Sequence, residues 1–240
     1  TQTGVPFPVA LMVTIVFAAV LGIVLERIVL RPLIGEPIIA VIMVTIGLAG
    51  ILKGATHIIW SPEYRFFPEI FPPEPLDLGF AIIPSGLLWG FLFALVCTAF
   101  FSAVFRFTRT GLAMRATASN QQAALSMGIS VKRVFALSWS FAAITAAIGG
   151  IIIGNIGGIS IYMGNIGLKV LSVIILGGLD SIVGAIIGGF IIGILENLTG
   201  LYLDPILGGG TKDLAPFIVL VIIIMIRPFG LFGKPIIERV

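Results

Sequence analysis

Few side chains in this sequence could carry out covalent chemistry. A serine protease mechanism requires a histidine beside the serine, and His57 is the single histidine. It stands near Trp60 at one end of an apolar run, where an interfacial role is expected. An aspartyl protease mechanism requires two carboxylates that can meet. Asp180 follows two glycines, but only Glu196 could be a second acid within an apolar run. The residues therefore argue against an enzyme.

The spacing of residues also gives no metal or phosphate site. No group of histidines and cysteines has ligand spacing, and Cys97 is the single cysteine. The string Gly208-Gly209-Gly210-Thr211-Lys212 has the residue types of a phosphate-binding loop but not its Gly-x4-Gly-Lys spacing, so it predicts a turn. We expect no metal, no cofactor bound by this chain and no ATP hydrolysis by it.

The composition places much of the chain in a membrane. Of its 240 residues 58% are apolar and 10% are charged, whereas a soluble domain carries about a quarter charged residues. So few charges cannot cover the surface of a soluble protein, and the bilayer must be the solvent for much of the chain. We expect an all-α, polytopic transmembrane helix bundle with Gly-broken helices. No polar linker divides the sequence, so residues 1–240 are predicted to form a single domain.

Apolar runs of roughly 20 residues predict the transmembrane helices. They are Pro8–Leu25, Ile38–Trp60, Phe80–Phe105 and Val134–Gly154, with a short last run at Leu214–Ile226. A further apolar region is broken at Gly177–Ser181 into segments around Ile161–Leu176 and Ile182–Leu198. Lys169 in the first of these must snorkel, face a cavity or lie outside a shorter half-helix.

The charges of the loops predict the orientation of the spans. The loop at about 106–133 carries Arg106, Arg109, Arg115, Lys132 and Arg133 and no acid, so it is cytoplasmic by the positive-inside rule. The loop at about 61–79 is acidic and rich in proline, with Glu63, Glu69, Glu74, Asp77, Pro62, Pro68, Pro72, Pro73 and Pro75, and is predicted to lie outside. The tail, with Arg227, Lys234 and Arg239, is again cytoplasmic. An even number of passes must separate the two cytoplasmic segments. Two central passes satisfy this and give seven in all, with the N-terminus outside; a re-entrant hairpin is the alternative.

The apolar runs contain many of the 30 glycines of the chain. Gly184 with Gly188, and Gly189 with Gly193, form pairs of small residues four positions apart. Such pairs let helices approach closely in a bilayer. The sequence leaves open whether these helices simply pack or line a translocation path.

The segment between the third and fourth spans predicts a short cytoplasmic helix. Residues 112–127 contain good helix formers and no proline. Gly128 can end this helix as a left-handed cap residue, and Ser130 can cap the next one. The helix would either connect two spans along the membrane surface or insert into a groove of a cytoplasmic partner.

The string Gln122-Ala123-Ala124-Leu125-Ser126-Met127-Gly128, together with several others in their order and spacing, resembles the permeases of branched-chain amino-acid ABC importers. It is similar to their Glu-Ala-Ala-x-x-x-Gly box, with Gln122 in place of the usual Glu and no Leu-Pro downstream. The other strings are Glu26-Arg27 with Arg31-Pro32-Leu33, Thr45-Ile46-Gly47-Leu48, Thr110-Gly111 with Met114-Arg115-Ala116, Leu176–Ala185, in which Asp180 replaces a usual Gly, and Arg227–Gly233. The last resembles the ending of H-type subunits of leucine/isoleucine/valine importers. The family has a membrane-entry segment upstream of the point where Thr1 starts, so we expect an N-terminally truncated member.

The resemblance implies a membrane-spanning permease subunit, not an enzyme, in the cell (inner or plasma) membrane. It would form the pathway for a branched-chain or other small amino acid delivered by an extracytoplasmic binding protein. Its partners would be a second permease subunit, membrane lipid and ATP-binding cassette subunits that use the ATP, and no nucleic acid. The cytoplasmic helix would be the coupling helix that docks on the ATPase. The candidate coupling residues are Arg115, Asn120, Gln122, Ala123, Ala124 and Gly128.

Candidate substrate contacts are polar residues in or near the spans. They are Thr45, Asn155, Asn165 and Asn197, with Ser138 and Ser140 beside them. Such groups also commonly bond to a neighbouring helix. A pathway with few charges suits a small zwitterion, and equally urea or a short amide, which related permeases carry. A channel or secondary transporter that works without an ATPase is the rival class, and the scarcity of charges in mid-membrane counts against it.

Overall fold

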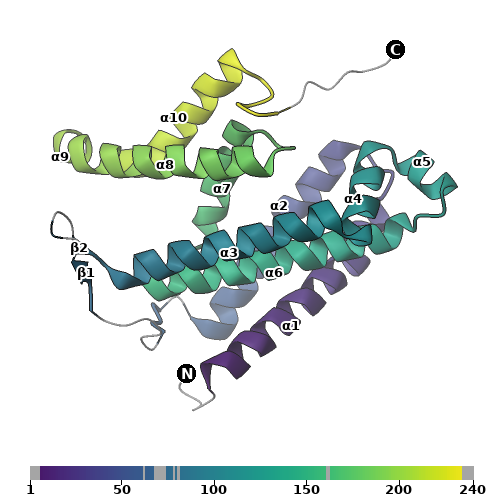
Figure 1. Cartoon of the computed structure of the whole chain (residues 1–240), viewed down its shortest axis with the longest axis horizontal. Coiled ribbons are helices and arrows are strands. Elements are labelled where there is room, and N and C mark those ends of the chain that lie inside the picture. The colour runs from purple at the N-terminus through teal and green to yellow at the C-terminus, as the bar shows by residue number, and fades with distance from the viewer. Residues whose placement is uncertain are drawn as a thin grey trace. The chain divides into compact units, whose positions relative to one another are not determined.

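The computed structural model describes residues 6–61, 63–67, 74–77, 79, 82–160 and 163–233, and these residues are mostly helical (Figure 1). The backbone forms two compact units, Thr1–Ile161 and Tyr162–Val240, which are described separately. The predicted all-α class is confirmed, since the only strands among the described residues form a two-residue hairpin, besides one isolated bridge. That residues 1–240 act as one domain stays a prediction.

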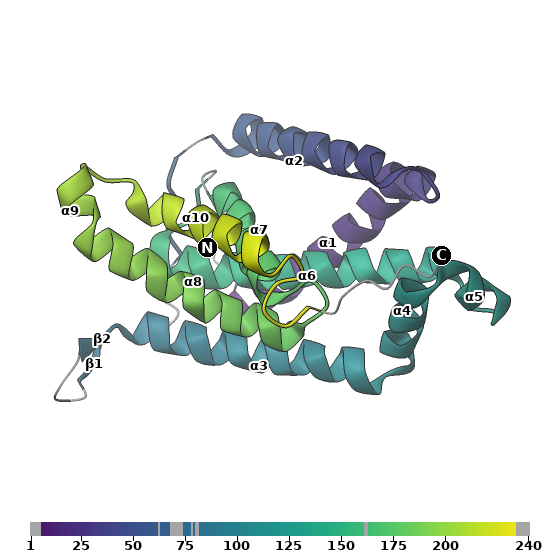
Figure 2. The same cartoon turned by 90° about the horizontal axis from the view of Figure 1, so that it is seen from above.

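The first unit contains four long helices and a short helical pair. Its elements are α1 (Phe7–Leu25), η1 (Glu26–Leu30), η2 (Arg31–Leu33), α2 (Ile38–Trp60), β1 (Leu76–Asp77), β2 (Ile82–Ile83), α3 (Ser85–Phe107), α4 (Arg109–Ser119), α5 (Gln121–Ser126) and α6 (Val131–Gly157). Figure 2 shows α4 and α5 together at one end of α3 and α6. The second unit contains α7 (Gly164–Gly177), α8 (Ile182–Tyr202), α9 (Asp204–Leu207) and α10 (Thr211–Ile226).

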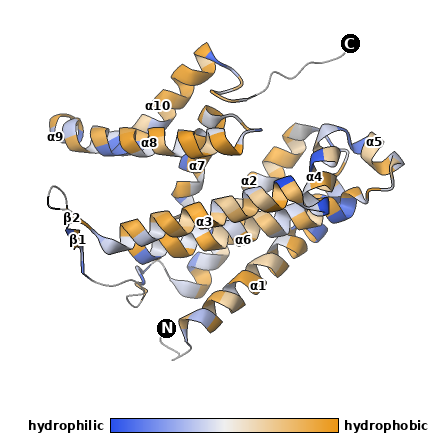
Figure 3. Cartoon of the chain, in the orientation of Figure 1, coloured by the Kyte–Doolittle hydropathy of each residue, from blue (hydrophilic) through white to orange (hydrophobic). Residues whose placement is uncertain are grey.

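In the part of the chain that the structure describes, five helical segments are long and apolar enough to cross a membrane. They are Phe7–Leu33, Ile39–Trp60, Ser85–Phe107, Val131–Gly157 and Ile182–Tyr202. The apolar colour covers most of their length in Figure 3, whereas hydrophilic residues gather around α4. With 14 and 16 residues, α7 and α10 are only about 21 and 24 Å long, less than the roughly 30 Å of the hydrocarbon core. Seven passes and the outward N-terminus therefore stay predictions.

Proline sets the start of each of the first three spans. Pro6, Pro37 and Pro84 occupy the N-cap positions of α1, α2 and α3. Proline suits a helix start because its missing N–H would lack an intrahelical partner there anyway. The prediction that the third span extends from Phe80 is wrong in this respect: α3 begins at Ser85, and Ile82–Ile83 pair with Leu76–Asp77 instead. Phe80 itself lies outside the described residues, as do Pro62, Pro68, Glu69, Pro72, Pro73, Lys234 and Arg239.

The first span is longer than its apolar run predicted. The helix was expected to end at Leu25, but it continues through the π-helical turn η1 and the 3-10 turn η2. Arg31 explains the continuation, because its guanidinium pairs with the fully buried Glu26 through contacts of 3.2 Å from Nε to Oε1 and 2.9 Å from Nη2 to Oε2. A two-contact pair of this kind keeps the carboxylate compensated inside the fold.

Glycine allows α1 to approach α6 closely. A Cβ atom at Gly22 would lie 2.6 Å from the carbonyl oxygen of Trp139 and 3.0 Å from the Cα of Ser140. The other side of α6 faces α3, where the rings of Phe101 and Phe141 meet edge to face with centroids 6.1 Å apart. The helix that follows α5 is therefore packed between two spans.

The second unit is built on a close crossing of α7 and α8. Gly177 and Gly184 face each other so closely that a Cβ on either would collide with the other's carbonyl oxygen. The predicted break at Gly177–Ser181 is confirmed: Gly178 has a φ of +104°, and the Ser181 hydroxyl accepts a 2.9 Å bond from Gly184 N–H at the start of α8. The chain beyond α10 returns to this turn, where Leu231 N–H donates to the Leu176 carbonyl at 2.8 Å.

Candidate functional site

The predicted cytoplasmic helix over residues 112–127 is two helices, so that prediction is wrong in detail. Asn120 has extended backbone angles (φ −158°, ψ 109°) between α4 and α5. Its side-chain Oδ1 accepts a 2.9 Å bond from Ala123 N–H, which makes it the N-cap of α5. Asparagine favours this position because its side chain replaces the missing partner of a first-turn N–H. The sequence analysis missed this break because the alanines of the segment favour a continuous helix.

The end of α5 follows the prediction for Gly128. This residue has a φ of +81°, in the left-handed region, and its N–H donates to the Leu125 carbonyl at 3.0 Å. Ile129 N–H then reaches back to the Ala124 carbonyl at 3.0 Å, as in a glycine-ended helix. Ser130 stands at the N-cap of α6, as predicted, but its side chain makes no capping bond. Both ends of α5 are thus fixed by local bonds.

The surface of α5 combines small, polar and apolar side chains. Asn120, Gln122, Ala123 and Gly128 are exposed, whereas Ala124 is buried at 3% exposure. Leu125 and Met127 are also exposed, at 57% and 83%. Sequence reasoning did not single out this apolar pair, although both residues lie within the Gln122–Gly128 string. A helix that turns two large apolar side chains outward at the end of a bundle presents a surface suited to a partner.

Arg115 holds α4 to the end of α3. Its guanidinium donates to the backbone carbonyls of Phe105 and Arg106, the second at 3.4 Å. These carbonyls lie in the last turn of α3, where helical partners are missing and a cation is favoured. Gly111 lets α4 come this close, because a Cβ there would collide with the Phe105 carbonyl. The structure therefore gives Arg115 a positioning role, and its predicted contact with an ATPase stays a prediction.

An open cleft of about 330 Å³ separates the α4–α5 junction from the start of α6. Its lining contains Met114, Thr117, Ala118, Ser119, Asn120, Gln121, Val134, Phe135, Ser138 and Trp139. Ser138, a candidate substrate contact, lines this cleft, and its role in a substrate pathway stays a prediction. All ten lining side chains are uncharged.

The other polar candidates lie apart on their helices. Thr45 on α2 donates to the Ile42 carbonyl at 2.8 Å, and Asn197 on α8 donates to the Gly193 carbonyl at 2.8 Å. Such bonds to the preceding turn satisfy a polar group within its own helix. Asn155 is half-buried on α6, and Asn165 is exposed in the first turn of α7. Ser140 is buried at the contact of α6 with Gly22. Their role in a substrate pathway stays a prediction.

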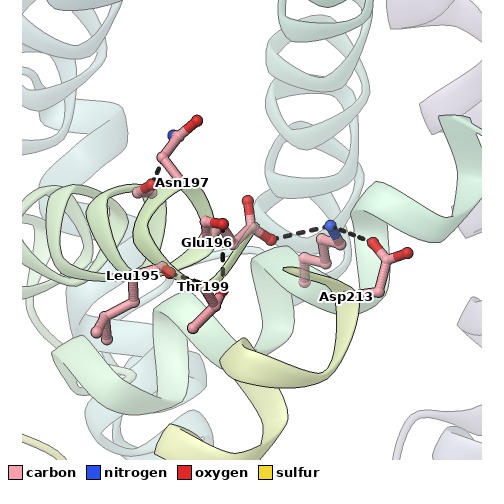
Figure 4. A network of polar contacts seen from close by, with 7 residues as sticks. Leu195, Glu196, Asn197, Thr199 and Asp213 are labelled. Carbon is pink, nitrogen blue, oxygen red and sulfur yellow. Dashed lines mark hydrogen bonds and ion pairs between the residues drawn. The ribbon is translucent and has the colours of Figure 1, made fainter. Parts of the chain in front are cut away.

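A cluster of charges joins three helices of the second unit (Figure 4). Lys169 Nζ on α7 lies 2.9 Å from Glu196 Oε1 on α8 and 2.8 Å from Asp213 Oδ1 on α10. The side chains of Lys169 and Glu196 are 24% and 18% exposed, and that of Asp213 is 76% exposed. Asn197 points away from these ion pairs in Figure 4. Lys169 and Glu196 had been noted singly, but Asp213 was missed because it lies on another helix, 17 positions after Glu196.

A second carboxylate stabilises the loop between α8 and α10. Thr211 N–H donates to Asp204 Oδ1 at 2.7 Å, and the Thr211 hydroxyl donates to the same oxygen. Both bonds lower the pKa of Asp204 below its usual 3.8, and the bond from the hydroxyl has the larger effect on the pKa. The predicted turn is confirmed for Gly208–Gly210, whereas Thr211 and Lys212 already form the start of α10. Among the residues that the structure describes, no three potential metal ligands gather.

Comparisons with known proteins agree with this architecture. A family model described as "Branched-chain amino acid transport system / permease component" matches residues 1–226. The high-affinity branched-chain amino acid transport system permease protein LivH of Escherichia coli K12 is 30% identical over 237 residues, which cover 94% of this chain and 74% of LivH. The corresponding protein BraD of Pseudomonas aeruginosa is 26% identical over 239 residues, covering 96% of this chain and 76% of BraD. No solved structure matches. This chain is a multi-pass membrane protein and belongs to the family of branched-chain amino acid transport permease components.

Proposed function

We propose that this chain forms part of the transmembrane pathway of an ABC importer for branched-chain amino acids and that α5 is its contact with an ATPase. The observation that carries the proposal is α5 itself, a helix of six residues fixed at both ends and placed between two spans. It lies within the string that resembles the coupling box. LivH and BraD, which are named as permeases for branched-chain amino acids, support the substrate class.

The connections of α5 are suited to transmitting a displacement. On one side α4 is tied to the end of α3 through Arg115. On the other side only residues 127–130 separate α5 from α6, which packs closely against α1 at Gly22. A partner that moves Leu125 and Met127 would therefore move α6 and, through it, α1. ATP hydrolysis itself belongs to the partner in this proposal.

The direct test is to purify the full-length protein with its associated subunits and to measure ATP-dependent uptake of leucine into liposomes with a binding protein. The proposal expects an ATPase to co-purify and uptake to require ATP. Gly128→Val should abolish uptake while the protein still inserts, because a β-branched residue is strongly disfavoured at a φ of +81°. Gly128→Asn, which tolerates this conformation, is the matched control.

Two results would overturn the proposal. Uptake of leucine without any ATPase would indicate a channel or secondary transporter, and would reduce α5 to a connection between spans. ATP-driven uptake of urea or a short amide, with no uptake of leucine, would keep the transporter class and exclude the substrate class.

A further inference from the structure

The charged cluster of the second unit has one negative charge in excess. Lys169 is its only cation, whereas Glu196 and Asp213 both lie within 3 Å of the same Nζ atom. Two ion pairs to this one ammonium group connect α7 with α8 and with α10. An ion pair at low dielectric is costly to desolvate and is a weak source of stability. The contact of Lys169 with Asp213, whose side chain is 76% exposed, likewise contributes little to stability, which leaves Asp213 available for another role.

The cluster lies toward the outer end of the second unit according to the predicted orientation. The tail that begins at Arg227 is predicted to be cytoplasmic, so the end of the second unit away from this tail is predicted to lie outside. Lys169 is in the second turn of α7, and Asp213 is in the first turn of α10. The opposite end contains the Gly178–Ser181 turn and the returning segment at Leu231–Phe232, which precede the basic tail. A substrate released outside would reach the cluster first.

The two carboxylates are not equivalent. Glu196 is 18% exposed and lies in the last third of α8, with its Oε1 2.9 Å from Lys169 Nζ. Asp213 is 76% exposed, so solvent can replace its contact with Lys169 at small cost. Lys169 is thus held by one fixed partner and one exchangeable partner.

We propose that Lys169, Glu196 and Asp213 form a receiving site for a small zwitterion with a free α-ammonium and a free α-carboxylate. The inference rests on the proposed function and names the site at which the substrate enters. The carboxylate of the zwitterion takes the place of Asp213 beside Lys169 Nζ. The ammonium group pairs with the Asp213 carboxylate that this exchange releases. No proton moves and no covalent bond changes.

Such an exchange adds one opposite-charge contact and leaves neither Lys169 nor Asp213 without a partner. One ion pair between Lys169 and Asp213 becomes two, with the zwitterion between them, while Glu196 stays in place. The two charges of the ligand are therefore compensated as they leave water, which is the condition for burying charge in an apolar surrounding. A ligand that carries only one of the two charges leaves either Lys169 or Asp213 without its partner. The site therefore discriminates a zwitterion from urea or a neutral amide.

The test compares three ligands on the purified permease–ATPase complex without a binding protein. The probes are leucine, leucine methyl ester, which lacks the carboxylate, and 2-hydroxyisocaproate, which lacks the ammonium group. Thermal stabilisation of the complex should occur with leucine and not with the two analogues at the same concentration. Asp213→Asn should remove the leucine effect and weaken leucine uptake by about tenfold or more. Asp180→Asn, which removes an exposed carboxylate at the opposite end of the same unit, should leave both unchanged.

The outcomes separate this inference from the proposed function. If the parent complex imports leucine but Asp213→Asn retains both the leucine effect and the uptake, the site is refuted and the function stands. If the parent complex does not import leucine at all, the proposed function fails. Should Asp213→Asn fail to assemble, Lys169→Arg preserves the charge but alters its geometry. The site predicts a raised KM for leucine in that variant with unchanged ATPase activity, and an unchanged KM would overturn it.

Discussion

Replacing Gly22 by alanine tests whether the contact of α1 with α6 is as close as the structure shows. The added Cβ would lie 2.6 Å from the Trp139 carbonyl oxygen, whereas carbon and carbonyl oxygen normally approach to about 3.3 Å. The helices must therefore separate by about 0.7 Å or the backbone must bend. Overpacking of this kind costs about 1–3 kcal/mol, and alanine regains about 0.5–1 kcal/mol in helix propensity. We expect a net destabilisation of about 1–2 kcal/mol.

The measurement is the thermal unfolding of the purified protein in one detergent. The loss corresponds to a decrease in Tm of about 2–8 °C for a chain of this size. Gly150→Ala is the matched control, because it makes the same substitution on α6 where a Cβ would meet nothing within 4 Å. That variant should be as stable as the parent protein or slightly more stable. If Gly22→Ala unfolds at the same temperature as Gly150→Ala, the close packing of α1 on α6 is refuted.

Three further variants test other parts of the structure. Arg31→Met leaves the fully buried Glu26 unpaired and should lower the free energy of unfolding by about 3–5 kcal/mol. Adding Glu26→Gln to this variant should restore most of the loss. Equal stability of the single and double variants would contradict the ion pair. Asn120→Ala removes the N-cap of α5 and should lower the free energy of unfolding by about 1 kcal/mol. It should also lower the amount of leucine taken up per ATP hydrolysed. An unchanged ratio of uptake to ATP hydrolysis would show that the cap does not serve coupling. Thr211→Val removes the hydroxyl that lowers the pKa of Asp204, a group whose stabilising effect is present above its usual pKa of 3.8 and is lost as pH falls through the lower folded pKa. Above the usual pKa of 3.8, the free energy of unfolding should thus be smaller for this variant than for the parent protein. The difference should disappear as the pH falls through the lowered pKa of Asp204. A difference that persists in acid would exclude ionisation of Asp204 as its cause.

The positions of glycine and proline made several local features predictable. Gly128 ends α5 and the Gly177–Ser181 string separates α7 from α8, because both turns need a backbone conformation that other residues disfavour. Two helix boundaries were predicted wrongly because a residue that the prediction did not consider sets each of them. Pro84 delayed the start of α3, and Asn120 divided the coupling segment into two helices.

Contacts between distant residues could not be predicted in the same way. The pairing of Lys169 with Glu196 and Asp213 depends on the register of three helices, and that register is set by backbone contacts at Gly177 and Gly184. The sequence did not predict that the Arg115 guanidinium binds carbonyls in the last turn of α3, because that contact depends on how closely Gly111 brings α4 to them. The exposure of Leu125 and Met127 likewise depends on which face of α5 the rest of the unit covers.

The sequence by itself determined the solvent, the class of fold and the family, since these depend on composition, on the length of apolar runs and on strings of neighbouring residues. The tertiary structure decided which charges meet, which helix ends are capped and which side chains remain exposed. The physical reason is the distance along the sequence over which each effect acts. Hydropathy and turn propensity depend only on residues within one turn or one span. An ion pair such as Lys169 with Asp213 forms only when packing has brought separate helices together.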